Sequence, residues 1–174
     1  DTDCTDGQVT MTKNLTCTAT FKAVRKLTVT KAGQGSGKVT STPTGIVCGT
    51  ACNAFFYLDQ QVTLAALPNT GSTFTGWSGD LTCPKPVMSA NRTCSATFSP
   101  KYYPLLVIKT GAGQGTITSQ PTGISCGSDC EQDYAYNTLV TLTATPNAKS
   151  IFTGWAGACK GKNATCQVTV SKAR

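Results

Sequence analysis

The chain has 174 residues, a formal net charge of +7, ten cysteines and no histidine. Its lysines are dispersed, which argues against the basic stripe of a nucleic-acid-binding protein, and no apolar run approaches the roughly 20 residues that a membrane span needs. The missing histidine removes the commonest general base, and the eight carboxylates form no pair that recurs along the chain. We therefore expect no enzyme activity, no catalytic or metal-binding residues and no cofactor.

The sequence contains an internal repeat. Residues 27–79 align with residues 105–157 without a gap, and 27 of the 53 aligned positions are identical. A partial third copy lies at the start, where CTDGQVTMTKNLTCTATF (4–21) resembles CPKPVMSANRTCSATF (83–98). This periodicity predicts three parts. They are residues 1–22 (terminal strands of a preceding or neighbouring repeat), 23–100 (repeat 1) and 101–174 (repeat 2, which lacks its last strand).

Each repeat is predicted to consist of short strands. LTVTK (27–31) and KVTST (38–42) alternate apolar and polar residues and are rich in β-branched side chains. The glycines between them, in AGQGSG (32–37), predict a hairpin turn. Further strands are expected at VTLAALP (62–68), STFTGW (72–77) and TCSATF (93–98). No segment shows the pattern of a helix of three turns, so the fold class is predicted to be all-β. The tandem small β-rich modules are expected to be either β-grasp-like or small sandwiches.

The cysteines are spaced as short local pairs. STPTGIVCGTAC (41–52) returns as SQPTGISCGSDC (119–130), with two cysteines four residues apart each time. One zinc site shared by both pairs is an open alternative, but the chain has no histidine to join them. Pairing each cysteine within its own region predicts the disulfides Cys4–Cys17, Cys48–Cys52, Cys83–Cys94, Cys126–Cys130 and Cys159–Cys166. Such staples suit small cores in an oxidising, extracellular setting.

These motifs resemble a known family. PTGIVCGTAC (43–52) with FTGWSG (74–79), and their second copies, are similar to the divergent internalin-B-type B-repeat of bacterial surface proteins. The resemblance covers nearly the whole chain. It implies tandem extracellular β-rich modules, related to the β-grasp architecture and found in adhesins and long secreted proteins, with no catalytic residues to carry over. The chain departs from the pattern because its second repeat lacks the final TCxATF strand and its first residues carry a surplus one.

The two ends of the chain are complementary. SKAR (171–174) aligns with SANR (89–92), after which repeat 1 continues into TCSATF. An open sheet edge is a template for an incoming strand, so the surplus strand of one chain is predicted to complete the last repeat of the next. This intersubunit strand consists of Leu15, Thr16, Cys17, Thr18, Ala19, Thr20 and Phe21. The prediction is a head-to-tail homopolymer; the alternative left open is an excised segment whose neighbouring repeats belong to a longer chain.

The sequence thus favours an extracellular structural repeat protein, as a surface stalk, adhesin segment or filament subunit. The alternative is a glycan- or ligand-binding accessory module of a larger secreted protein. Its candidate contact surfaces are the aromatic residues of FFY (55–57) and YY (102–103), with Tyr134 and Tyr136. The tryptophans of the two FTGW motifs are expected in the core.

Three asparagines match the N-glycosylation pattern. Asn14, Asn91 and Asn163 each stand in an N-x-T-C sequence. A turn that leads into a strand explains the same pattern, because asparagine tolerates turn conformations. Both interpretations stay open at this point.

Overall fold

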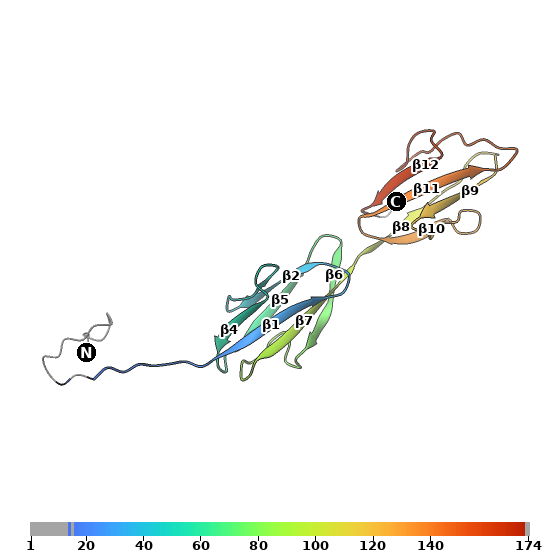
Figure 1. Cartoon of the computed structure of the whole chain (residues 1–174). Coiled ribbons are helices and arrows are strands. Elements are labelled where there is room, and N and C mark those ends of the chain that lie inside the picture. The colour runs from blue at the N-terminus through green and yellow to red at the C-terminus, as the bar shows by residue number, and fades with distance from the viewer. Residues whose placement is uncertain (1–13, 15, 173–174) are drawn as a thin grey trace.

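The computed structural model describes residues 14 and 16–172. Over these residues it contains twelve strands and no helix, and so nothing there could cross a membrane as a helix. Two β modules follow each other end to end (Figure 1). Repeat 1 runs from β1 to β7, and repeat 2 runs from β8 to β12. The predicted all-β class with tandem modules is confirmed.

Repeat 1 consists of two sheets. Its strands are β1 (Val24–Ala32), β2 (Gly37–Thr42), β3 (Val47–Cys48), β4 (Asn53–Tyr57), β5 (Thr63–Pro68), β6 (Ser72–Gly79) and β7 (Arg92–Pro100). The strand orders are β4-β1-β7-β6 and β3-β2-β5. β7 lies between β1 and β6, parallel to the first and antiparallel to the second.

The two sheets enclose one core. Alternate residues of each strand point inward, so that Leu27 and Val29 of β1 face Val39 of β2 and Leu64 of β5 in a single buried cluster. Phe98 of β7 is also part of this cluster and is 0% exposed. The architecture is therefore a small sandwich, and of the two predicted forms the sandwich is the one observed.

The predicted hairpin between the first two strands is wrong. β1 and β2 belong to different sheets, so the glycine run carries the chain from one sheet to the other. A Cβ at Gly33 would collide with the carbonyl oxygen of Phe98, and one at Gly35 would lie 2.6 Å from the carbonyl carbon of Ser99. The glycines are needed because the chain passes directly against the backbone of β7.

Repeat 2 contains fewer strands. They are β8 (Tyr102–Leu106), β9 (Gly115–Gln120), β10 (Glu131–Ala135), β11 (Thr138–Pro146) and β12 (Thr165–Val170). The sheet orders are β10-β8 and β12-β11-β9. The β8 to β11 ladders repeat those of β1, β2, β4 and β5.

β12 has an equivalent in repeat 1, but it is not β7. In repeat 1 the segment 84–88 lies along β5, where Val62 N donates to Pro86 O at 2.9 Å and Leu64 N donates to Pro84 O at 2.8 Å. β12 pairs with β11 in the same way, with Val140 opposite Val168. Within the described residues of repeat 2, no strand takes the place of β7.

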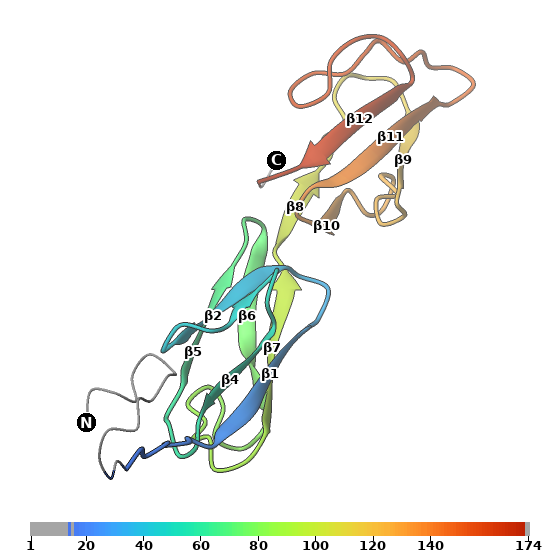
Figure 2. The same cartoon turned by 60° about the vertical axis from the view of Figure 1, so that its left-hand side comes forward.

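The two modules meet at a short junction. Lys101 alone separates β7 from β8. Its backbone N donates to Gly71 O at 2.8 Å, and its carbonyl accepts a hydrogen bond from Tyr136 N at 2.7 Å. The rings of Tyr103 and Tyr136 pack beside it, with centroids 6.3 Å apart. β7 thus continues almost directly into the next module (Figure 2).

Candidate functional site

β7 closes the core of repeat 1. Its inward side chains Cys94, Ala96 and Phe98 are all 0% exposed. The ring of Phe98 packs edge-on against Phe74 of β6, with centroids 5.7 Å apart. A Cβ at Gly37 would overlap the Phe98 ring, so the ring rests directly on the backbone of β2. The strand supplies both the middle of a sheet and a wall of the core.

Repeat 2 has an open groove at the equivalent place. The groove has a volume of about 890 Å³ and is lined by residues 105–117, residues 149–159 and parts of β11 and β12. Its two long walls are the counterparts of β1 and β6, between which β7 lies in repeat 1. Core residues such as Val107, Ile117 and Leu142 face the groove. Repeat 2 is therefore open along the side on which repeat 1 is closed.

The counterpart of β6 is not a strand. Residues 150–157 carry the same FTGW motif, yet they form no ladder. The reason lies in the sheet order, because β6 is an edge strand whose only neighbour is β7. In repeat 2 the Trp155 backbone N instead donates to Gly161 O at 2.7 Å, and its indole Nε1 donates to Asn163 O at 3.0 Å.

The rim of the groove is apolar and exposed. Leu106, Ile108 and Ile151 are 48%, 73% and 83% exposed. Threonines occupy the matching positions in repeat 1, at Thr28, Thr30 and Thr73. Exposed apolar side chains gathered around a groove are typical of an interaction surface.

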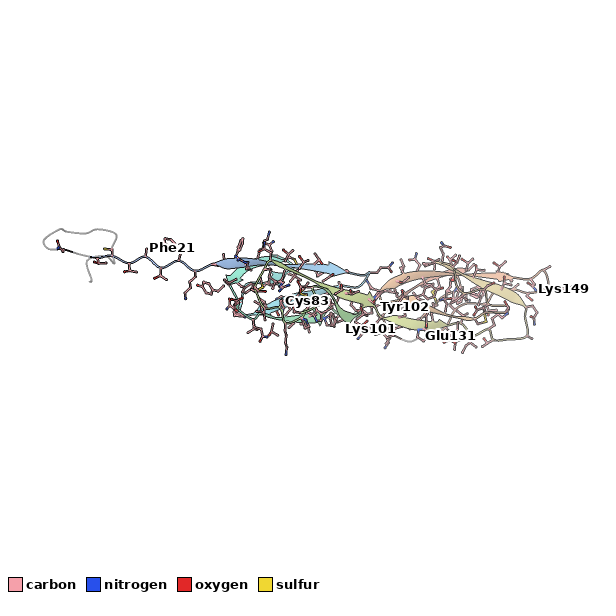
Figure 3. The ribbon with its side chains drawn as sticks, turned by 90° about the horizontal axis from the view of Figure 1, so that it is seen from below. Phe21, Cys83, Lys101, Tyr102, Glu131 and Lys149 are labelled. Carbon is pink, nitrogen blue, oxygen red and sulfur yellow. A yellow bond between two sulfur atoms is a disulfide. The ribbon has the colours of Figure 1, made fainter. Side chains whose placement is uncertain are left out.

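The predicted intersubunit strand lies outside both modules. Asn14 and Thr16–Phe21 are exposed and form no strand, and Phe21 is 92% exposed. Figure 3 shows this tail extending away from repeat 1, at the end opposite repeat 2. Cys17 is disulfide-bonded. Leu15 lies outside the described residues, as does Cys4, so the pairing of Cys4 with Cys17 stays a prediction.

The described disulfides are all local. They join Cys48 to Cys52, Cys83 to Cys94, Cys126 to Cys130 and Cys159 to Cys166. The zinc alternative is wrong because all four sulfurs of the two CxxxC motifs are engaged in these bonds. Over the part of the chain that the structure describes, no three metal-ligating side chains gather at one place.

The aromatic candidates separate into two groups. Phe56 and Tyr134 occupy equivalent positions and are each 5% exposed, so their prediction as contact surfaces is wrong. Both point inward because each is the fourth residue of its strand and shares the inward face with the second. The Tyr134 hydroxyl is 2.7 Å from Ser119 Oγ, which satisfies it inside the core.

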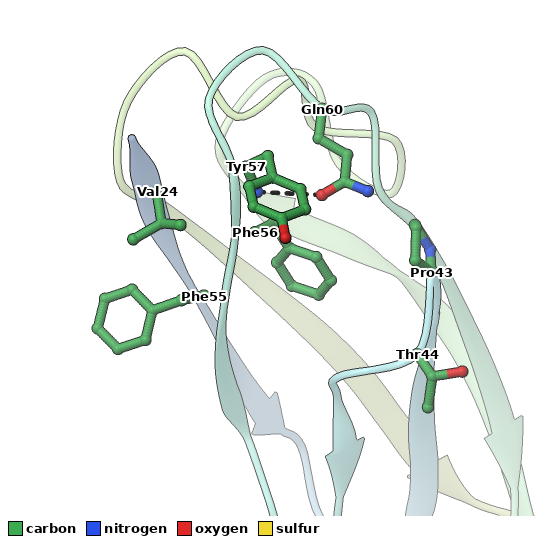
Figure 4. Close-up of a pocket in the computed structure, with 7 residues that line it drawn as sticks. All are labelled: Val24, Pro43, Thr44, Phe55, Phe56, Tyr57 and Gln60. Carbon is green, nitrogen blue, oxygen red and sulfur yellow. Dashed lines mark hydrogen bonds between the residues drawn. The ribbon is translucent and has the colours of Figure 1, made fainter. Parts of the chain in front are cut away.

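Phe55 and Tyr57 alternate with Phe56 and are 66% and 54% exposed. Together with Val24 and Gln60 they line a shallow hollow of about 310 Å³ (Figure 4). The ammonium group of Lys22 lies 5.1 Å from the centroid of the Tyr57 ring. Of the other candidates, Tyr102 is 55% exposed.

The tryptophans pack on the cores as expected. Trp77 lies 5.5 Å from Phe74, and Trp155 lies 5.2 Å from Phe152, measured between ring centroids. Each tryptophan is half-buried against the core of its own repeat. Of the glycosylation candidates, Asn14 and Asn163 are exposed. The Oδ1 atom of Asn91 accepts a hydrogen bond from Lys26 N at 2.9 Å, which gives this asparagine a structural role beside β1.

One ion pair fixes the start of β7. Arg92 Nη1 lies 2.9 Å from Asp80 Oδ2, and this hydrogen bond holds the pKa of the Asp80 carboxyl below its ordinary value of 3.8. The ionised Asp80 carboxylate stabilises the folded state above the ordinary pKa. This stabilisation is lost as the pH falls through the lowered pKa of the folded state. We expect an NMR titration to show this low pKa and Arg92→Ala to return it toward the ordinary value. An unchanged Asp80 pKa in Arg92→Ala would contradict the assignment.

Comparison with known proteins finds the same two repeats. A family model, the divergent InlB B-repeat domain, matches residues 27–102 and 105–174. A search of curated proteins and a search of solved structures each give no match. The matched spans contain the two β modules and nearly the whole chain. The chain therefore belongs to the divergent InlB B-repeat domain family, whose repeats occur in extracellular surface proteins.

Proposed function

We propose that the chain is an extracellular structural repeat protein, a surface stalk, adhesin segment or filament subunit, that assembles head to tail by strand addition. One observation carries the proposal: repeat 2 has an open groove where repeat 1 holds β7. The N-terminal LTCTATF (15–21) matches RTCSATF (92–98) of β7 at five of seven positions. The chain thus carries both an acceptor and a matching strand.

The tail cannot reach its own groove, so in the proposed assembly a second copy donates the strand. β1 and β7 are parallel, and β7 ends next to repeat 2, so β1 begins at the far end of repeat 1. Phe21 lies three residues before Val24, a reach of about 10 Å, whereas the nine residues of β1 span about 30 Å. A head-to-tail contact that does not close on itself propagates as a filament.

Both hydrogen bonding and apolar burial favour the addition of the strand to the groove. An incoming strand pairs with residues 105–110 on one side and with residues 150–157 on the other, where Trp155 N exchanges its present bond to Gly161 O for one to the new strand. Burying one phenylalanine side chain contributes about 1.5–3 kcal/mol. The disulfides support a location outside the cell, where such bonds persist. The proposed partners are further copies of the chain, or neighbouring repeats where the segment lies in a longer protein, and the role requires no catalysis.

The test compares the intact chain with a variant that lacks residues 1–21. The described residues of this tail belong to neither core, so we expect both proteins to give the same far-UV circular dichroism. Negative-stain electron microscopy should show filaments from the intact chain and only monomers from the truncated one. Monomers from both proteins, over a range of concentrations, would refute assembly by strand addition.

A second candidate function rests on the exposed rings of Phe55 and Tyr57. Flat aromatic faces beside a shallow hollow are suited to stacking on sugar rings. NMR titration of the truncated chain with neutral and anionic oligosaccharides tests this candidate separately from assembly. Binding that Tyr57→Ala abolishes would support it, and no shifts at these residues would exclude it.

A further inference from the structure

We infer that the incoming strand enters the groove parallel to β8 in a single register, with Phe21 as its anchor, its ring facing Gly115 and its backbone lying along Gly111 and Gly113. The inference rests on the proposed function and makes it specific. The recognised residues belong to the tail of the second copy, and the residues that contact them line the groove of repeat 2. Both sets follow from the way in which β7 is held in repeat 1.

The register follows from the pairing of β1 with β7. Val29 lies opposite Cys94, and Lys31 lies opposite Ala96, in a parallel ladder. The equivalent acceptor residues of repeat 2 are Val107 and Lys109, and the equivalent donor residues are Cys17 and Ala19. In this register Cys17, Ala19 and Phe21 face inward, because alternate residues of a strand share a face.

Three glycines form the seat of the anchor. In repeat 1, Gly33, Gly35 and Gly37 lie directly against Phe98 and Ser99 of β7, leaving no room for a Cβ. The same glycines recur in repeat 2 as Gly111, Gly113 and Gly115.

Among the described residues of repeat 2, no aromatic side chain lies against Gly111 or Gly113. A Cβ at Gly111 would meet no atom within 4 Å, and one at Gly113 would meet only the Ser150 side chain at 3.5 Å. At Gly115 the nearest atom would be the Thr145 carbonyl oxygen, at 2.8 Å. Space is therefore open at Gly111 and Gly113 for the backbone of an incoming strand, whereas at Gly115 the Thr145 carbonyl must shift to admit the Phe21 ring.

The opposite wall offers the second contact. Phe74 lies opposite Phe98 in the β6–β7 ladder and packs against its ring. The matching residue, Phe152, is half-buried beside the groove. To pair with Ala19, the backbone of Trp155 must exchange its present bond to Gly161 for one to the incoming strand. The seat for Phe21 thus lies between Phe152 and the glycine backbone.

Neither the tail nor repeat 2 carries a charge at the positions that correspond to the Arg92–Asp80 ion pair. In repeat 1, Arg92 at the start of β7 pairs with Asp80. The residue that aligns with Arg92 in the tail is Leu15, and the residue that aligns with Asp80 in repeat 2 is Ala158. The ion pair is replaced on both sides, so the tail enters repeat 2 without leaving an unpaired charge on either partner.

The test uses a synthetic peptide of residues 14–23, with Cys17→Ala, and the chain that lacks residues 1–21. We expect the peptide to bind, as measured by isothermal titration calorimetry, and a Phe21→Ala peptide to bind at least about tenfold more weakly, since a buried phenylalanine is lost.

Gly113→Ala in the acceptor is expected to abolish peptide binding while leaving thermal unfolding unchanged, because the added Cβ only touches Ser150 at 3.5 Å. Gly127→Ala is the matched control. It lies in the same repeat but outside the groove, and its Cβ would meet only Thr116 at 4.0 Å. This control variant should bind the peptide like the parent chain.

The outcomes separate the two proposals. If neither Phe21→Ala in the peptide nor Gly113→Ala in the acceptor weakens peptide binding, the proposed register is wrong, while head-to-tail assembly is not contradicted. Absence of peptide binding, together with filaments that depend on residues 1–21, overturns the groove as the acceptor. Absence of peptide binding together with a monomeric intact chain overturns both the inference and the proposed function.

Discussion

Phe98→Ala is expected to lower the free energy of unfolding of repeat 1 by about 3–5 kcal/mol, the usual loss for a buried phenylalanine. The ring is 0% exposed, packs against Phe74 and rests on the backbone of Gly37. Its removal leaves a cavity that the rigid glycine run cannot fill. Urea unfolding followed by the fluorescence of Trp77 and Trp155 measures the change.

Phe21→Ala is the matched control, because Phe21 ends the same TCxATF motif. Its side chain is 92% exposed, so the change should stay within about 0.5 kcal/mol when the chain is measured as a monomer. Equal losses in the two variants would show that Phe21 is already buried. A loss below about 1 kcal/mol in Phe98→Ala would show that β7 does not close the core.

Reduction of the disulfides is expected to unfold both repeats at room temperature. Each repeat holds two described disulfides that close short loops, and each is worth about 2–3 kcal/mol in the chain-entropy model. Their joint loss approaches the total stability of a small domain, about 5–15 kcal/mol. Circular dichroism in dithiothreitol, against the oxidised chain, measures the transition.

The double variant Cys48→Ala/Cys52→Ala removes one staple and keeps the other three described disulfides. We expect it to fold, with repeat 1 weakened by about 2 kcal/mol and repeat 2 unchanged. A fully reduced chain that keeps its native circular dichroism and its unfolding midpoint would contradict the view that these small cores need staples.

Much of the fold could be predicted from the sequence. The alternation of apolar residues in LTVTK and KVTST is local, and it correctly indicated β1 and β2. The internal repeat also shows, by alignment alone, that residues 105–174 contain no copy of TCxATF. In the structure, the position that β7 occupies in repeat 1 is an open groove in repeat 2.

Other features could not be predicted, because they depend on distant partners. The period of a strand does not tell which strand lies beside it. The glycines of residues 32–37 therefore predict a hairpin, whereas in the structure they approach β7 some 60 residues later. The same limit hid the parallel insertion of β7 between β1 and β6. In FFY (55–57) three adjacent aromatic residues mask the alternation that buries only Phe56.

The most direct measurement mixes two variants of the chain. The first keeps residues 1–21 and carries Gly113→Ala, so it can only donate a strand. The second lacks residues 1–21 and keeps the groove, so it can only accept one. Light scattering coupled to size exclusion should show each variant alone as a monomer, with a mass near 18.1 kDa for the one that keeps residues 1–21, and a one-to-one complex in the mixture that grows no further. Failure of the mixture to form this complex, or self-association of the variant that lacks residues 1–21, would contradict strand addition between copies.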